Sequence, residues 1–200
     1  MPEPNVERPS LAPYYGLMTR RVQAARVAAV EPWLRGAGAV LDVGCGLSDL
    51  PLRLAPYVGC DRNPVVLSEM RRRHPGVPFL EWDVAAAPPP DELLRRAPFS
   101  RVLMLALLEH LSDPAAALAR VASLLGEDGR LVVTTPHPRG RIVLEAGARL
   151  GLLSRHADEE HEDLVSPRAL AAAAAGAGLA VAASGTFLLG LNQWAVLARR

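Results

Sequence analysis

Residues 40–46 read Val-Leu-Asp-Val-Gly-Cys-Gly, a short apolar run that breaks on one carboxylate and two glycines. Only a residue without a Cβ lets the backbone lie flat against a ligand at the end of a strand. We therefore expect a bound molecule over Gly44 and Gly46, although a tight strand-to-helix turn can use the same two glycines without any ligand.

Two further apolar runs end on a carboxylate in the same way. Residues 57–60 are followed by Asp61, and residues 79–82 are followed by Asp83. Successive strands of a right-handed parallel sheet place their carboxyl ends along one edge. The pattern therefore predicts that Asp42, Asp61 and Asp83 surround a single crevice.

This arrangement resembles the class I S-adenosylmethionine-dependent methyltransferases, whose first motif is matched in full by residues 40–46. The likeness extends over residues 34–135. It implies an α/β fold, a Rossmann-like doubly wound sheet of seven mostly parallel strands whose last strand is antiparallel. We expect one methyltransferase domain over residues 34–200, carrying a lid insertion at about 136–165 and preceded by an N-terminal arm and cap helix over residues 1–33.

The resemblance implies S-adenosyl-L-methionine as the cofactor and a set of residues that bind it: Asp42, Gly44, Cys45, Gly46, Asp61, Arg62, Asp83, Val84, Leu105 and Ala106. Gly44 and Gly46 would approach its methionine and ribose parts, with Asp42 near its amino group through water. One departure is visible, because Ser48 stands where the family usually has a third glycine and is followed by a short segment carrying Pro51. The helix after the first strand should therefore be shorter than usual.

The later strand ends complete the implied site. Asp61 would accept hydrogen bonds from both ribose hydroxyls. Asp83 would accept a hydrogen bond from the adenine amino group, while the backbone of Val84 contacts the ring. The backbone of Leu105 and Ala106, at the end of the fourth strand, would face the methionine ammonium group.

Three histidines are candidate general bases. Methyl transfer is an in-line displacement that depends on alignment, and a hydroxyl acceptor must also lose its proton, which histidine can take near neutral pH. His110 falls at the mouth of the crevice, His137 lies just beyond the fifth strand, and His161 stands among carboxylates that favour its charged form. Family members often carry the pair Glu109-His110 without a catalytic role, so the base stays open.

The same pair resembles the Glu-x-x-Glu-His metal motif of ubiquinone-pathway and small-RNA 2′-O-methyltransferases. Its first glutamate would fall at position 106, which is alanine. Only Glu109 and His110 would remain, whereas such sites need four or more donors. We therefore expect no metal.

Helix boundaries are marked by a capping residue followed by proline at 63–64, 113–114 and 166–167. The first of these helices should run to His74, and Gly126 should end the second. An earlier helix over residues 18–33 should bury a stripe through Ala25 and Ala29 and direct Arg26 to another face. Strands are expected at 102–105, 130–134, 179–187 and 194–197, the last two antiparallel.

Residues 136–165 form too long a segment for an ordinary connection. They lie at the ligand-binding edge of the predicted sheet and carry arginines, histidines and the acidic run 158–163. We expect a lid that contacts substrate, with a solvated surface excursion as the alternative for the acidic run.

Composition limits the function further. A net charge of +1 lacks the basic excess of nucleic-acid binders, and all 22 basic residues are arginine, which suggests a bacterial gene of high GC content. No apolar stretch approaches the length of a membrane span. Cys45 and Cys60 are expected to be reduced thiols of a cytoplasmic protein.

Together these features predict methyl transfer to a small-molecule acceptor at a hydroxyl oxygen, without nucleic-acid or membrane partners. A nucleic-acid methyltransferase is the first alternative, and a binding or scaffold protein that keeps the cofactor fold without turnover is the second. The acceptor and the oligomeric state are not given by the sequence.

Overall fold

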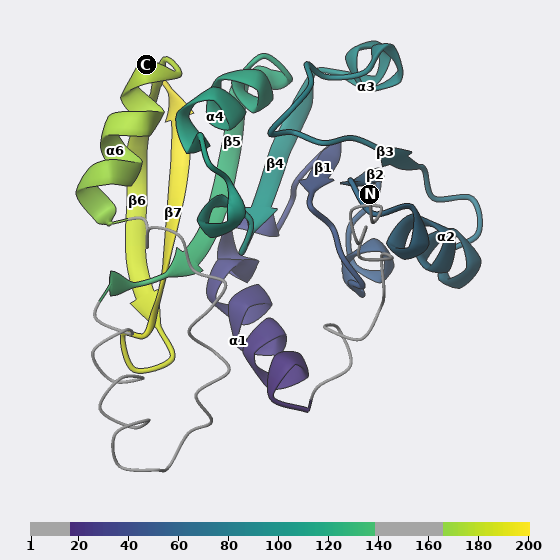
Figure 1. Cartoon of the computed structure of the whole chain (residues 1–200), viewed down its shortest axis with the longest axis horizontal. Helices are drawn as coiled ribbons and strands as arrows, with labels where there is room; N and C mark the ends of the chain where they lie inside the picture. The colour runs from purple at the N-terminus through teal and green to yellow at the C-terminus, as the bar shows by residue number, and fades with distance from the viewer. Residues whose placement is uncertain (1–16, 139–165) are drawn as a thin grey trace, which may run out of the picture.

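The computed structural model describes residues 17–138 and 166–200. Its centre is a seven-stranded sheet in the order β3-β2-β1-β4-β5-β7-β6 (Figure 1). The strands are β1 (Val40–Val43), β2 (Tyr57–Asp61), β3 (Phe79–Glu81), β4 (Phe99–Leu105), β5 (Leu125–Pro136), β6 (Leu179–Phe187) and β7 (Asn192–Arg199). Strands β1 to β5 pair in parallel, and β7 is antiparallel to both β5 and β6. The predicted fold class is confirmed.

One helix precedes the first strand in the described part of the chain, and the others connect successive strands: α1 (Leu17–Leu34), then η2 (Leu50–Leu52), α2 (Pro64–Arg73), α3 (Asp91–Arg96), η3 (Leu108–His110), α4 (Pro114–Ala122) and α6 (Pro167–Gly176). Asn63, Asp113 and Ser166 each accept a backbone N–H of the helix that they precede, and proline follows each of them. These caps confirm the predicted starts of α2, α4 and α6.

The prediction that Gly126 ends the second capped helix was wrong. Helix α4 ends at Ala122, and Gly126 already belongs to β5. The cause is the burial of Leu124 and Leu125, which the chain achieves by turning into the sheet at once. The carbonyl of Leu124 accepts the N–H of Phe99 on β4 at 2.9 Å.

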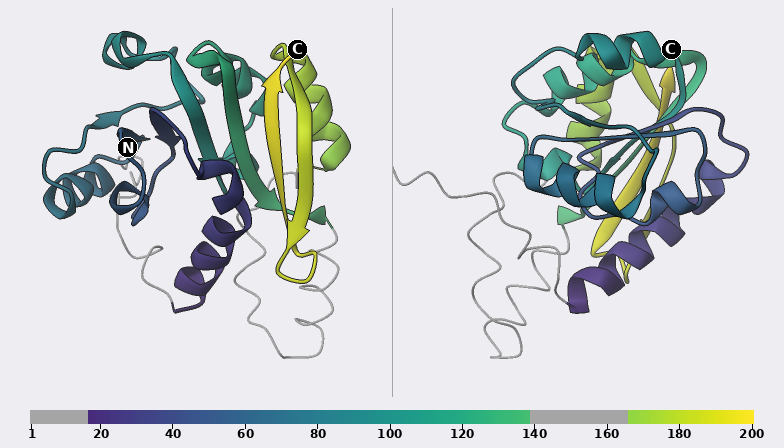
Figure 2. Two further views of the ribbon diagram at one scale, coloured as in Figure 1. Left: turned by 180° about the vertical axis from the view of Figure 1, so that it is seen from behind. Right: turned by 90° about the vertical axis from the view of Figure 1, so that its right-hand side faces the viewer.

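Helices lie on both faces of the sheet (Figure 2). A cluster of buried apolar side chains lies between the helices and the sheet on each face. Alternate residues of a strand point to opposite faces, so Val102 and Met104 of β4 join the layer under α3, α4 and α6, while Leu103 joins the layer under α1 and α2. Burial on both faces explains why these strands read as unbroken apolar runs.

Helix α1 is rotated relative to its predicted orientation. Its most buried side chains are Val30 and Leu34, while Ala25 and Ala29 are only half buried. Larger branched side chains bury more apolar surface than alanine, and they decide which face meets the sheet. Arg26 is consequently turned inward, where the sequence pattern had directed it to another face.

The strand order reverses between β1 and β4, the neighbours at the centre of the sheet. In such sheets the crevice beyond the carboxyl ends of these strands is the usual place for a ligand. The short η2 follows β1 and confirms that the helix there is reduced to one turn.

No helix in residues 17–138 and 166–200 has the length and apolar character needed to cross a bilayer.

Candidate active site

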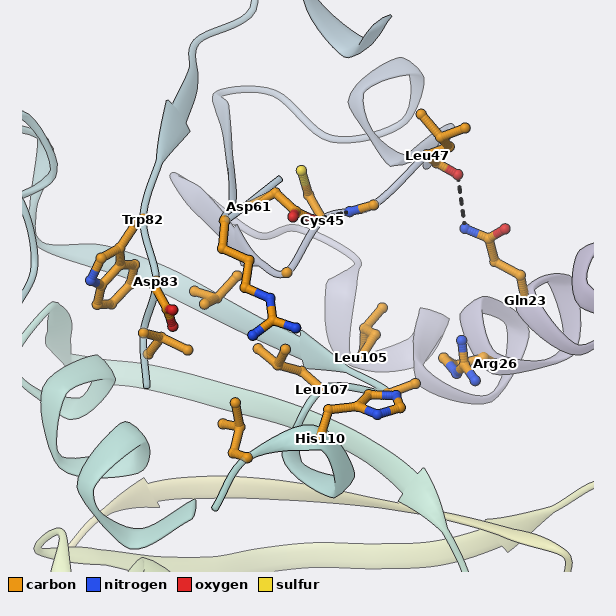
Figure 3. A pocket seen from close by; sticks show the side chains of 17 residues that line it. Gln23, Arg26, Cys45, Leu47, Asp61, Trp82, Asp83, Leu105, Leu107 and His110 are labelled. Carbon is orange, nitrogen blue, oxygen red and sulfur yellow. Dashed lines mark hydrogen bonds between the residues drawn. The ribbon is translucent and has the colours of Figure 1, made fainter. Parts of the chain in front are cut away.

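A cavity of about 350 Å³ opens at this reversal point (Figure 3). Every predicted cofactor residue except Asp42 lines it: Gly44, Cys45, Gly46, Asp61, Arg62, Asp83, Val84, Leu105 and Ala106. Trp82 and Asp83 lie at one end, and Gln23 and Arg26 lie at the other. The topology has therefore brought four strand ends onto one ligand-sized space.

The glycine turn after β1 is held in a conformation that suits a ligand. The N–H groups of Gly44 and Cys45 both donate to the carbonyl of Cys60, at 2.8 and 2.9 Å. Gly44 and Gly46 have φ angles of 71° and 52°, in the region that side chains disfavour. A Cβ at Gly44 would also lie 3.0 Å from the Leu107 side chain. The backbone conformation therefore favours glycine at position 44, and a Cβ there would also make the Leu107 side chain shift.

Asp61 ties this turn to the next strand. One carboxylate oxygen accepts the N–H of Gly46 at 3.0 Å, and the other accepts the N–H of Asn63 at 2.9 Å. Each oxygen keeps a second lone pair for another donor. The carboxylate is therefore fixed in place and still able to accept a pair of hydroxyl groups.

The opposite end of the cavity is built after β3. Asp83 accepts the N–H of Ala85 at 2.9 Å through one oxygen, and the buried Trp82 lies beside it. Arg120, from α4, donates to the carbonyls of Val84 and Ala85 at 2.9 and 3.0 Å. Sequence reasoning missed Trp82 and Arg120. The first could have been found as the apolar neighbour of Asp83, whereas nothing in the local pattern marks the second.

We expect Arg120→Met to lower the affinity for S-adenosyl-L-homocysteine about five- to tenfold, because two carbonyls of the adenine-side loop lose a charged donor. Calorimetric titration measures this effect. Arg96→Met is the matched control, since Arg96 forms an exposed ion pair with Glu92 on α3 and should leave the affinity unchanged. Equal affinities for all three proteins would show that Arg120 does not hold this loop.

Helix α1 closes the other end. Gln23 donates its side-chain N–H to the carbonyl of Leu47 at 3.1 Å and so joins the helix to the glycine turn. Arg26 lines the cavity, and burial lowers its pKa while the nearby Glu109 raises it. Glu109 is 4% exposed, and burial raises its pKa to about 7. The sequence pattern had placed Arg26 on another face of α1, so it did not predict that Arg26 lies near Glu109.

The candidate histidines are separated by the fold. His110, on η3, is exposed and lines the cofactor cavity. His137 donates its backbone N–H to Leu191 at 2.9 Å and lines a separate hollow of about 130 Å³ beside Trp194. His161 and most of the predicted lid lie outside the described residues, so their roles stay predictions.

Asp42 lies behind the glycine turn. It is 2% exposed and accepts a hydrogen bond from the Tyr57 hydroxyl at 2.7 Å. Burial is the main cause that raises its pKa, to about 7, with the Asp61 charge adding to the rise and the Tyr57 bond opposing it. Its carboxyl group is therefore engaged with β2, and a water-mediated contact with a cofactor stays a prediction.

Cys45 and Cys60 are free and buried, and burial raises the pKa of both thiols. They are uncharged packing residues at neutral pH. Within residues 17–138 and 166–200, no three histidine, cysteine or acidic side chains are grouped to hold a metal ion. Ala106, where a metal motif would have glutamate, has a φ angle of 56° and donates its N–H to Thr134 at 2.9 Å.

A glycine turn at the reversal point, with one carboxylate at the end of β2 and another after β3, is the arrangement expected of class I S-adenosylmethionine-dependent methyltransferases. A family model described as a methyltransferase domain matches residues 16–184, and this chain belongs to that family. The residues fit the cofactor, since Asp61 and Asp83 keep acceptor capacity and the glycine turn at Gly44 and Gly46 lines the cavity.

Several curated proteins are similar in sequence. A ubiquinone biosynthesis O-methyltransferase of Xanthomonas axonopodis is 32% identical over 162 residues, covering 77% of this chain and 68% of the relative. A trans-aconitate 2-methyltransferase of Methylobacterium nodulans is 38% identical over 106 residues, covering 48% and 38%. The chain spans 38% to 51% of the length of the first curated relatives that it matches.

Solved structures share the fold at lower identity. The magnesium protoporphyrin IX methyltransferase of Synechocystis, crystallised with S-adenosyl-L-homocysteine, superimposes with a TM-score of 0.68 at 19% identity over 92% of this chain and 88% of that one. A methyltransferase of Mesorhizobium loti gives 0.68 at 16% identity, covering 89% of this chain and 100% of that one.

Proposed function

We propose that this methyltransferase acts on a small molecule and methylates a hydroxyl oxygen. The observation that carries this proposal is that His110, a candidate base within the described part of the chain, lines the cofactor cavity together with Leu105 and Ala106 at the end of β4. The similarity to a relative named as an O-methyltransferase supports the same reaction.

The bound cofactor supplies an electrophilic methyl group on its sulfonium sulfur. The chain contributes binding and alignment. Asp61 accepts hydrogen bonds from the ribose hydroxyls, and Asp83 accepts one from the adenine amino group. The turn at Gly44 and Gly46 supports the methionine part. His110 accepts the proton that the acceptor hydroxyl loses. Alignment of this kind supplies much of the barrier reduction in a two-substrate reaction.

The net charge of the chain favours a small acceptor over a nucleic acid. The net charge of +1 gives little attraction for a phosphate backbone. If the alternative were right and the acceptor were a nucleic acid, RNA or DNA would be methylated at a higher rate than small hydroxyl compounds. Release of S-adenosyl-L-homocysteine from a panel of phenols, sugars, carboxylic acids and nucleic acids tests this directly, and the proposal fails if hydroxyl compounds are not methylated.

With a hydroxyl acceptor in hand, we expect His110→Gln to lower kcat about tenfold and to leave the affinity for S-adenosyl-L-homocysteine within twofold. The loss should be smaller than the hundredfold or more that is usual for general base catalysis, because His110 is exposed and solvent water can take the proton instead. His137→Gln is the matched control and should leave kcat unchanged. If the His137 variant were the slower one, the base would have been assigned to the wrong histidine.

We also expect turnover to survive exhaustive chelation, because Ala106 supplies no oxygen donor beside Glu109 and His110. The measurement is the initial rate before and after treatment with EDTA. Loss of activity that one divalent ion restores would instead assign these two side chains as metal ligands.

A further inference from the structure

One side of the molecule is built from a long stretch of sequence without charge. Residues 169–198 contain no acidic residue, arginine, lysine or histidine, although 22% of the residues in the chain are charged. They supply most of α6, all of β6 and nearly all of β7, which lie together at the left of Figure 1. Charged residues are usual on protein surfaces and are depleted at the centre of protein–protein interfaces. This side of the molecule therefore has the composition of an interface.

Strand β6 presents an open edge of the sheet on this side. Among the strands that the structure describes, β6 is the last in the sheet order, with β7 as its neighbour. It is nine residues long, and its exposed residues are all uncharged: Ala180, Val181, Ala182, Ser184 and Thr186. Native sheets usually protect such an edge with charged side chains, with proline or by keeping the strand short. These three protections are missing from β6.

The opposite edge of the sheet is protected. Strand β3 has only three residues, and it ends on the exposed Glu81. On β6 the one protective feature is a shift in register between Val181 and Ala183, which disturbs the first part of the strand. The following stretch, residues 183–187, pairs regularly with β7. Its outer edge is therefore suited to pairing with another strand.

We propose that two copies of this chain associate through β6, as antiparallel strands related by a twofold axis at the stretch 183–187. An antiparallel strand is complementary to itself about such an axis, because each residue meets the same surface from the other side. The pairing satisfies backbone donors and acceptors along both edges, and no like charges meet across it.

The helix beside this edge fits the same arrangement. An axis perpendicular to the sheet places the two α6 helices on the same face, side by side, since α6 packs against β6. The exposed residues of α6 after Arg168 are small: Ala169, Ala171, Ala172 and Gly176. Small side chains allow two helices to approach closely, so α6 would extend the contact made by β6.

The cofactor cavity lies away from this interface. Strands β5 and β7 stand between β6 and β4, whose end lines the cavity. Neighbouring strands are about 4.8 Å apart, so the interface lies about 14 Å from β4. Association of two copies should therefore leave the affinity for S-adenosyl-L-homocysteine unchanged.

The test is sedimentation equilibrium of the full chain at micromolar concentrations, where the wild-type protein should have twice the monomer mass of 21.4 kDa. The double variant Ser184→Lys/Thr186→Lys should be a monomer, and so should Ser184→Glu/Thr186→Glu, because like charges then face each other across the pair. An equal mixture of the two variants should form dimers again, since opposite charges meet. Glu81→Lys, at the β3 edge, is the control and should remain a dimer.

Several results would overturn the proposal. A monomeric wild-type protein would do so, including one that instead binds phosphatidylcholine vesicles. A dimer that persists in both double variants would use another surface, and a mixture that stays monomeric would show that the substitutions do not act across a shared strand pair.

Hydrogen exchange of the wild-type protein gives an answer even if the double variants fail to fold. Protection of the amides of residues 183–187 should rise with protein concentration, whereas protection of residues 79–81 should not. Protection of β6 that is independent of concentration would contradict the proposed interface.

Discussion

Asp61→Ala is expected to weaken binding of S-adenosyl-L-homocysteine by about a hundredfold or more, because it removes two contributions at once. The carboxylate is the proposed acceptor for the ribose hydroxyls, and hydrogen bonds to a charged group contribute about 1.5 to 3 kcal/mol. It also holds the N–H of Gly46 at 3.0 Å and that of Asn63 at 2.9 Å, so its loss loosens the glycine turn. Calorimetric titration measures the change.

Two variants separate these contributions. Asp61→Asn keeps one acceptor oxygen for the turn but loses the charge, so its affinity should lie between those of wild type and Asp61→Ala. Asp128→Ala removes an exposed carboxylate on β5 and should bind as wild type does. If Asp61→Ala were folded and bound the ligand normally, Asp61 would not belong to the site.

The second large effect is a loss of stability as pH rises. Burial raises the pKa values of Asp42 and Glu109 to about 7, well above those of the unfolded chain. Between about pH 4 and 7 the folded protein therefore binds more protons than the unfolded one, so the free energy of unfolding falls as pH increases. Their stabilising contribution is complete below about pH 4 and is lost as pH passes 7, at most about 3 to 4 kcal/mol for each group.

The opposite trend governs the acid limb. Arg72 and Arg73 hold the pKa of Glu69 at about 2, and this contribution is lost as pH falls below about 4. We therefore expect maximum stability near pH 4, where these opposing trends meet, measured as the urea midpoint from pH 3 to pH 8. Asp42→Asn and Glu109→Gln should each flatten the decline above pH 5. A wild-type midpoint that rises between pH 5 and 8 would contradict the raised pKa values.

Much of the fold could be predicted because its signals are local. The carboxylates at the ends of β1, β2 and β3 follow apolar runs, and the caps at Asn63, Asp113 and Ser166 combine a side-chain acceptor with a proline. Each signal depends on a few neighbouring residues, and the parallel sheet then brings the strand ends together. The glycines and carboxylates of the cavity follow from this reasoning, whereas the resemblance to a known family implied the other predicted lining residues.

The remaining features depend on contacts between distant parts of the chain. In an alanine-rich helix such as α1, several faces are similarly apolar, and packing of Val30 and Leu34 selects one of them. That choice turns Arg26 toward Glu109, a pairing that no local spacing records. Arg120 likewise reaches Val84 from a different helix. His137 lies beside β6 and β7 because of the antiparallel pairing at the end of the chain, which its own neighbours do not specify.

We expect one cofactor to lie across the reversal point of the sheet, with adenine at the Asp83 end of the cavity and the amino-acid part toward Arg26. A crystal structure with S-adenosyl-L-homocysteine is the most direct test. It should show adenine beside Asp83 and Trp82, both ribose hydroxyls on Asp61, and the amino-acid part over Gly44. A ligand bound outside this cavity, or bound inside it in the reverse direction with adenine at Arg26, would exclude this arrangement.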